Sequence, residues 1–185
     1  MALPAAFGVM MADAHRLART RLEASRTDHL ADFAIIVVGA SSGGVEALSR
    51  LASGLPRDIP AAMLVVQHIG RNPSRLPELL SRSGSLSAVH ARHGEVLRPG
   101  RIYVAPPDHH LLLFKGFIMR LSRGPRENWA RPAIDPMLRT AAETYGPRVA
   151  GVILTGYLND GTAGLLDVKR RGGRSAVPRL PVAAH

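Results

Sequence analysis

Almost continuously apolar runs alternate with amphipathic segments along most of this chain. Such runs are typical of parallel strands buried on both faces of a sheet. They lie at residues 33–39, 61–68 and 148–156. Segments with spaced apolar positions and a terminal glycine or proline predict helices. These lie at residues 43–56, 73–84, 135–146 and 160–173.

Shorter apolar segments fill the middle of the chain. Residues 87–93 and 100–106 are predicted as two short strands, and 110–114 with 117–122 as a hairpin. A polar, proline-bearing loop follows. In the helix after this loop, we expect Asp135 at the N-cap, Pro136 at the first helical position and Gly146 at the C-terminal end.

Strands that alternate with helices predict an α/β fold. We expect a doubly wound, mostly parallel, Rossmann-like sheet with helices on both faces and an inserted β-hairpin. The first 32 residues mix charge with alanine and predict an N-terminal extension that is helical or flexible. The packed domain is expected over residues 33–173, with residues 174–185 as a separate tail.

The charge and composition limit the possible functions. The formal net charge is +10, but aromatic residues are few (one Trp, three Tyr and four Phe), so a base-stacking surface for nucleic acid is not indicated. The chain has no cysteine. No apolar run approaches the ~20 residues of a membrane span, and the N-terminus lacks the order of a secretory signal. We therefore expect a cytoplasmic protein without membrane insertion.

Three turns that follow the long apolar strands carry reactive groups. Ser41 lies in "GASSGG", His68 in "QHIG" and Asp160 in "TGYLNDG". In open α/β sheets, ligands bind at the carboxyl ends of the strands. The sequence therefore predicts that these three side chains share one edge of the sheet.

The first of these turns has two interpretations. Glycines between a strand and a helix suit a phosphate, but "GASSGG" lacks both the G-x-G-x-x-G spacing and the Lys-Ser/Thr of a Walker loop. Residues 39–43 do match G-x-S-x-G, which presents a serine on a sharp turn. Small residues also occur in such turns simply to allow close packing, so the pattern alone leaves the alternatives open.

A histidine and a carboxylate favour the nucleophile. Serine needs a histidine to accept its proton, and a carboxylate to orient that histidine. His68 and Asp160 supply these groups, although His68 could instead be a buried core histidine and Asp160 an ordinary turn residue.

Five motifs, in this order, resemble the chemotaxis protein-glutamate methylesterase domain, the CheB family. They are "VVGASSGGVEAL", "VVQHI", "GRIYVAPPDHH", "RPAIDPML" and "GVILTGYLNDGTAGL", and the resemblance covers about residues 33 to 173. It implies a doubly wound α/β enzyme that hydrolyses γ-glutamyl methyl esters of chemoreceptors and can deamidate receptor glutamines. It implies neither a metal nor an organic cofactor, and the cytoplasmic domain of a methylated chemoreceptor as the partner.

The resemblance also implies roles for individual residues. Ser41 would be the nucleophile, His68 the general base and Asp160 the residue that orients His68. Oxyanion stabilisation would fall near Tyr157, with Ser42 as the neighbouring hydroxyl. Two residues of "RPAID", Arg131 and Asp135, would position the substrate.

The end of the chain departs from the family pattern. Residues 174–185, "RSAVPRLPVAAH", do not match the strand, acidic loop and helix expected there, which predicts a domain truncated at its C-terminus. The alternative function is therefore a catalytically silent, CheB-like binding module. A nucleotide-binding domain and a nucleic-acid binder are the remaining alternatives.

Overall fold

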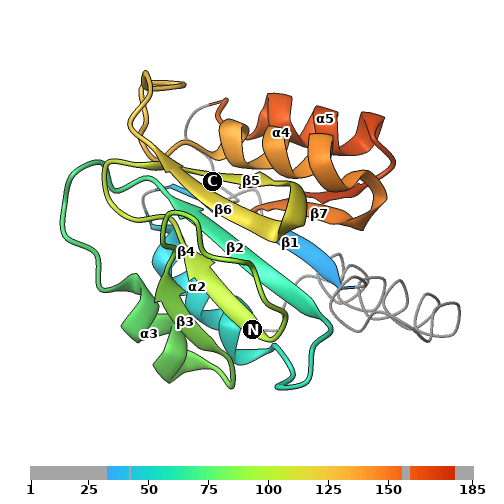
Figure 1. The fold of residues 1–185 in the computed structure, drawn as a ribbon. Helices are drawn as coiled ribbons and strands as arrows, with labels where there is room; N and C mark the ends of the chain where they lie inside the picture. Colours follow the sequence, from blue (N-terminus) through green and yellow to red (C-terminus); the bar gives the residue numbers. More distant parts are fainter. Residues whose placement is uncertain (1–32, 42, 156–158, 178–185) are drawn as a thin grey trace, which may run out of the picture.

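A parallel sheet forms the centre of the molecule (Figure 1). The computed structural model describes residues 33–41, 43–155 and 159–177, and within them six strands pair in parallel throughout. Their spatial order is β3 (Ser87–His90), β4 (Arg101–Val104), β2 (Ala61–Gln67), β1 (Ala34–Ala40), β7 (Val149–Ile153) and β8 (Arg174–Ala176). The chain thus places β2, β3 and β4 on one side of β1 and the later strands β7 and β8 on its other side. This reversal creates a topological switch point at β1.

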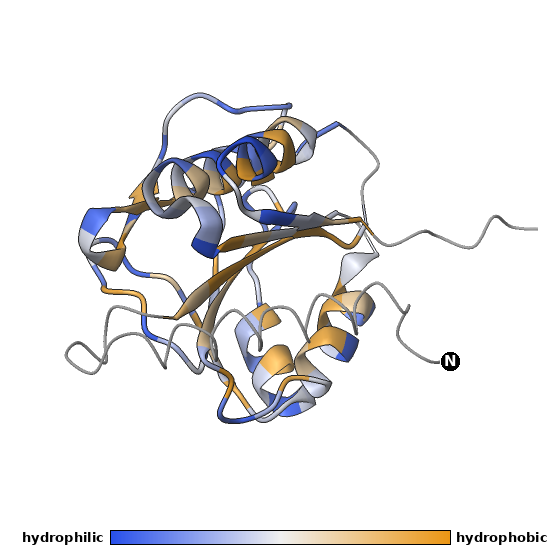
Figure 2. Ribbon diagram, turned by 90° about the vertical axis from the view of Figure 1, so that its right-hand side faces the viewer, coloured by the Kyte–Doolittle hydropathy of each residue, from blue (hydrophilic) through white to orange (hydrophobic). Residues whose placement is uncertain are grey.

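Helices cover both faces of this sheet (Figure 2). Helices α2 (Gly44–Ser53) and α3 (Leu76–Ser83) pack on one face. On the other face lie α4 (Ile134–Tyr145) and α5 (Thr162–Arg170), with the antiparallel hairpin of β5 (His110–Phe114) and β6 (Ile118–Ser122). Two short 3-10 turns, Lys115–Phe117 and Gly146–Arg148, follow β5 and α4.

The apolar runs are continuous because both faces of each central strand are buried. In β1, Ile35 and Val37 belong to the core under α4 and α5, whereas Ile36 and Val38 belong to the core under α2 and α3. Side chains alternate between faces along a strand, so a one-residue shift of register would exchange the two sets. Burying each such side chain contributes roughly 1.5–3 kcal/mol.

The expected doubly wound sheet with an inserted hairpin is therefore confirmed. One helix start was wrong: α4 begins at Ile134 with Ala133 as its N-cap, so Asp135 lies inside the first turn. Strand β8 was not predicted, and it begins at Arg174, inside the segment expected to be a separate tail. The extension over residues 1–32 lies outside the described residues.

None of the helices in the described part of the chain combines the length and apolar character needed to cross a bilayer.

Helices α4 and α5 pack tightly against each other at Gly164. A Cβ atom there would lie 2.5 Å from the Leu138 Cβ and 3.1 Å from the Asp135 Oδ1. The backbone N–H of Gly164 also donates to the Asp135 carboxylate over 2.7 Å. The absence of a side chain at position 164 is thus required for both the packing and the hydrogen bond.

We expect Gly164→Ala to destabilise the fold, because overpacking of about 1–3 kcal/mol outweighs the roughly 1 kcal/mol that alanine gains in a helix. Urea unfolding of wild type and variant measures the difference in the free energy of unfolding. Thr162→Ala, at an exposed position on the same helix, is the matched control and should change stability by less than about 0.5 kcal/mol. Equal stability of Gly164→Ala and wild type would contradict this account of the α4–α5 contact.

Candidate active site

The ends of β1 and β2 bring Ser41 and His68 side by side. Ala40 pairs with Gln67 in the parallel ladder, and the backbone N–H of His68 donates to the Ala40 carbonyl over 3.1 Å. Ser41 is the next residue along β1 and is buried, whereas the side chain of His68 retains 17% exposure. Both residues therefore leave the sheet at its carboxyl edge, as the sequence predicts.

The turn after β1 is fastened to the end of β7. The Ser41 backbone N–H donates to the Thr155 Oγ1 over 3.0 Å. A Cβ on Gly44 would come within 2.8 Å of the same hydroxyl oxygen, so this position needs glycine. Gly43, with φ of 82°, makes the left-handed turn that leads into α2. The partial positive charge of the α2 N-terminus thus lies next to Ser41.

Asp160 joins this edge from the loop after β7. Its Oδ2 lies 2.7 Å from the His68 Nε2, and its side chain is completely buried. Its carboxylate also accepts the backbone N–H groups of Ile134 (2.7 Å) and Asp135 (3.0 Å). Asp160 therefore occupies the N-terminus of α4, where the first N–H groups of a helix have no partner within it.

These donors determine the ionisation of Asp160. Burial alone would raise the pKa of this carboxyl, but hydrogen bonds from His68, two α4 backbone N–H groups and the Asn128 amide hold its pKa below the ordinary value. An ionised carboxylate can only accept hydrogen bonds. The His68 Nε2 therefore carries the hydrogen in this contact, which leaves Nδ1 of a neutral ring free to accept a proton.

Asp135 performs the same task for the neighbouring helix. Its Oδ1 accepts the backbone N–H groups of Gly161 (3.0 Å) and Gly164 (2.7 Å) at the start of α5. Asp160, which precedes α5, thus accepts N–H groups at the start of α4. Asp135, which lies in α4, accepts N–H groups at the start of α5. Burial, together with the nearby charge of Asp160, raises the pKa of Asp135, although its hydrogen bonds act in the opposite direction.

One amide links the two aspartates. The Asn128 Nδ2 donates to the Asp135 Oδ2 over 2.8 Å and to the Asp160 Oδ1 over 3.0 Å. Sequence reasoning did not find Asn128, since it lies in a loop without a recognisable motif. Thr155 was also missed, although a hydroxyl inside the "LTGYLNDG" motif was a signal that could have found it.

Arg131 lies in a different set of contacts. Its guanidinium pairs with Asp108 over 2.7 Å and donates to the carbonyls of Arg123 (3.0 Å) and Gly124 (2.8 Å). The side chain of Arg131 thus fixes the loop before α4, and no hydrogen bond to Ser41, His68 or Asp160 is found among the described residues. The predicted oxyanion residues Ser42 and Tyr157 lie outside the described residues.

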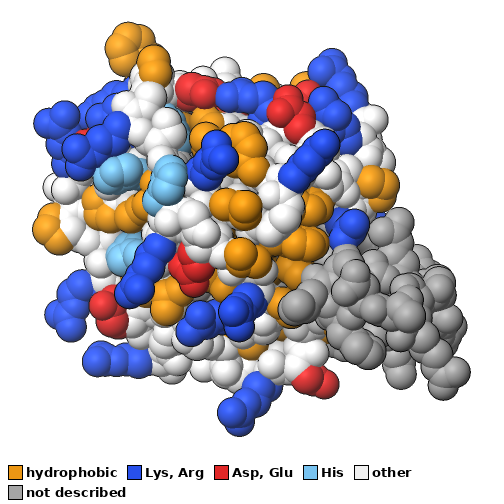
Figure 3. Space-filling model, in the orientation of Figure 1, with side chains coloured by type: hydrophobic (Ala, Val, Ile, Leu, Met, Phe, Trp, Pro, Cys, Tyr) orange, Lys and Arg blue, Asp and Glu red, His pale blue; other side chains and the backbone are white. Residues whose placement is uncertain are grey.

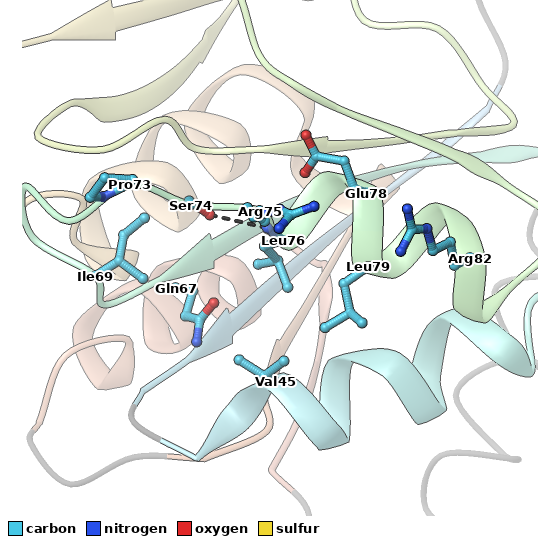
Figure 4. A pocket seen from close by; sticks show the side chains of 10 residues that line it. All are labelled: Val45, Gln67, Ile69, Pro73, Ser74, Arg75, Leu76, Glu78, Leu79 and Arg82. Atoms are coloured by element: carbon cyan, nitrogen blue, oxygen red, sulfur yellow. Dashed lines mark hydrogen bonds between the residues drawn. The ribbon is translucent and has the colours of Figure 1, made fainter.

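A cavity of about 400 Å³ opens beside this edge, between α2 and α3 (Figure 4). Gln67 and Ile69, the two neighbours of His68, form one end of it. Val45 and Leu79 supply apolar surface from the two helices. Ser74, which precedes α3 in the cavity wall, accepts the Leu76 N–H with its Oγ over 3.3 Å. Within the described residues, no cluster of three His, Asp or Glu side chains could hold a metal ion.

The fold and these edge groups define a doubly wound α/β protein in which a hydroxyl, an imidazole and a buried carboxylate share the carboxyl edge of the sheet. The chain belongs to the CheB methylesterase family, whose model matches residues 36–179.

Individual relatives agree with this assignment. The chain is 43% identical over 140 residues to a protein-glutamate methylesterase/protein-glutamine glutaminase of Anaeromyxobacter dehalogenans, covering 75% of this chain and 41% of the relative. It is 37% identical over 147 residues to a putative protein of the same name from Leptospira interrogans, covering 79% of this chain and 76% of the relative. The chain thus spans about two fifths of the first relative's length and three quarters of the second's.

A solved structure has the same fold. The crystal structure of the Thermotoga maritima CheB methylesterase catalytic domain matches with a TM-score of 0.74 and 38% identity, covering 77% of each chain.

We expect Asn128→Asp to destabilise the protein, because it places a third carboxylate between two that already share one amide. Like charges raise the pKa of the new carboxyl in the folded state, so the loss of stability should grow as the pH rises from 4 to 7. Chemical unfolding at both pH values measures this. Asn128→Gly, which suits the φ of 49° and adds no charge, is the control. A pH-independent loss in Asn128→Asp would contradict the explanation.

Asp160 makes the opposite contribution to pH dependence. Because its pKa is lowered in the folded state, its ionised form stabilises the fold fully above the ordinary aspartate pKa of about 4, and this contribution is lost as the pH falls below that value. We expect the stability difference between wild type and Asp160→Asn to shrink between pH 6 and pH 3. The exposed Asp58→Asn exchange is the control, and a difference that stays constant in Asp160→Asn would refute this assignment.

Proposed function

We propose that this chain is a serine esterase that hydrolyses γ-glutamyl methyl esters on chemoreceptors, with Ser41 as nucleophile, His68 as general base and Asp160 as the orienting acid. The observation that carries the proposal is the 2.7 Å contact of His68 with a buried Asp160, beside Ser41 at the strand ends. The family and the names of the relatives support the ester as the substrate class.

The proposed reaction is an acyl transfer in two steps. Ser41 Oγ attacks the ester carbonyl carbon while its proton passes to His68 Nδ1, and the imidazolium is stabilised by ionised Asp160. The ester C–O bond then breaks, and the departing methoxide oxygen takes this proton from His68, which releases methanol. Water attacks the glutamyl-enzyme with His68 again as base, which frees the glutamate side chain and Ser41. A glutamine side chain would follow the same course and release ammonia.

The imidazole orientation is a distinctive part of this proposal. In the usual serine triad, Nδ1 donates to the carboxylate and Nε2 faces the serine. Here Nε2 contacts Asp160, so Nδ1 would serve Ser41. The N-terminus of α2 would favour the negative charge that develops on the carbonyl oxygen. A backbone donor near Tyr157 remains proposed for this charge, with Ser42 as the neighbouring hydroxyl, and Arg131 and Asp135 remain proposed for substrate positioning.

The partner that we propose is the methylated cytoplasmic domain of a chemoreceptor, because the chain belongs to the CheB methylesterase family. The proposed reaction would then take place in the cytoplasm. No step requires a metal or an organic cofactor, since the three side chains supply the nucleophile, the base and the orienting charge.

Methanol release from methylated receptor fragments tests the proposal. We expect His68→Ala to lower the rate by about 10²–10⁴-fold, the usual contribution of a general base. His93→Ala, at an exposed position, is the matched control and should leave the rate within about twofold of wild type. A serine-reactive phosphonate should label wild type but not Ser41→Ala. If folded wild type neither releases methanol nor is labelled, a catalytically silent binding module is the better explanation.

A further inference from the structure

A tight turn stands between β6 and α4, and projects from the body of the molecule (Figure 1). Glu127 and Ala130 close it with two backbone hydrogen bonds, N–H of each to the carbonyl of the other, of 3.2 and 2.9 Å. The two residues between them, Asn128 and Trp129, have φ of 49° and 64°. Successive left-handed residues are typical of a type I′ turn, for which glycine is the preferred second residue.

Trp129 is an unfavourable choice for this position as far as folding is concerned. Its side chain is bulky, which makes a positive φ strained. It is also 89% exposed, so its large apolar surface contributes nothing to the core. Backbone strain and exposed apolar area at one residue indicate a purpose outside the fold, and such features gather at functional sites.

The turn that carries Trp129 is held from several directions. The Glu127 carboxylate pairs with Arg139 of α4 over 2.9 and 3.1 Å. The buried His110 donates from Nε2 to the Pro125 carbonyl over 2.9 Å. Arg131 binds the Gly124 carbonyl over 2.8 Å. The indole therefore stands on a fixed base, which reduces the entropy that a partner must overcome on binding.

The same turn is part of the candidate active site. Asn128 reaches inward to Asp160, which contacts His68, while the adjacent Trp129 faces solvent. Consecutive Cα atoms lie about 3.8 Å apart, so the residue that carries the indole directly adjoins the residue that supports this aspartate and histidine.

The surroundings of the turn are basic. Arg123 and Arg126 are exposed in the same loop, and Arg71 is exposed beside Asp108. In Figure 3, which has the orientation of Figure 1, Lys and Arg side chains gather at the upper left of the surface, below the projecting turn. A peptide segment with several glutamyl side chains is anionic wherever these are not esterified, which complements this charge.

We propose that Trp129 is a specificity-determining contact for the protein substrate. Its indole packs on the side-chain methylenes of an acidic peptide segment that carries the glutamyl methyl ester, while Arg123 and Arg126 attract the carboxylates of that segment. This inference rests on the proposed esterase function, and it adds a means to distinguish a peptide substrate from a small ester.

Kinetics with two substrates tests the inference. We expect Trp129→Gly to lower the ratio of kcat/KM for a methylated receptor fragment to kcat/KM for a small alkyl ester by about tenfold, mainly through KM, as is usual for an aromatic contact residue. Glycine suits the backbone at this position, so the midpoint of thermal unfolding should not fall. Trp129→Phe should restore most of the ratio, and Leu166→Ala, another exposed apolar position, should leave it unchanged. An unchanged ratio in Trp129→Gly would overturn the proposal.

Fluorescence gives a second, independent measurement, because Trp129 is the single tryptophan of the chain. In Ser41→Ala, which cannot turn over the ester, the methylated receptor fragment should shift the emission to the blue and protect it from acrylamide. An unchanged emission at saturating fragment would contradict the proposal. Protection that depends on protein concentration without fragment would instead assign the surface to a second copy of this chain.

The two proposals fail in different ways. If wild type hydrolyses neither substrate, the esterase function is wrong. If wild type hydrolyses both and Trp129→Gly does so with an unchanged ratio, the esterase stands and the role of Trp129 is wrong.

Discussion

The structure of this site depends on an exchange of hydrogen bonds between two helix starts and two buried carboxylates. The first N–H groups of α4 and α5 have no acceptors within their helices, and the carboxylates of Asp160 and Asp135 are buried. Asp160 accepts from α4, and Asp135 accepts from the start of α5. Each buried carboxylate thus provides the acceptor that a helix start lacks, and each helix start provides the donors that a buried carboxylate needs. As a result, the position of His68 depends on how the two helices pack, since Asp160 holds its ring.

The exchange also shifts the pKa values of the two carboxyls in opposite directions. They share the single Asn128 amide, yet the pKa of Asp160 is lowered while that of Asp135 is raised. Burial raises the pKa of both carboxyls, but Asp160 has the imidazole of His68 as a further partner that lowers its pKa, whereas the charge of Asp160 raises the pKa of Asp135. An ionised Asp160 fixes which nitrogen of His68 carries the hydrogen. The packing of α4 on α5 therefore affects the proposed chemistry, because it positions the carboxylate that determines the tautomer of His68.

Local sequence patterns predicted most of the fold and the residues at the strand ends. Buried parallel strands are continuous apolar runs, and the side chains that follow them must meet at one edge, so Ser41, His68 and Asp160 could be placed together. Asp135 was misplaced because Asp-Pro before an apolar run is also the pattern of an N-cap. Its real donors belong to Gly161 and Gly164, which no local rule connects to it. The short edge strand β8 lacks an apolar run, and Asn128 acts through contacts that its loop sequence does not reveal.

The turn at Asn128 and Trp129 shows how function can act against local preference. If only the inward reach of the Asn128 amide were required, glycine at position 129 would give the same turn with less strain and less exposed apolar surface. The indole therefore has no explanation within the fold. Asn128 and Trp129 share one turn, so the residue that supports Asp160 is covalently joined to the residue that faces the solvent. A substrate segment that packs on the indole, as proposed, would therefore contact the same turn that supports the His68–Asp160 pair.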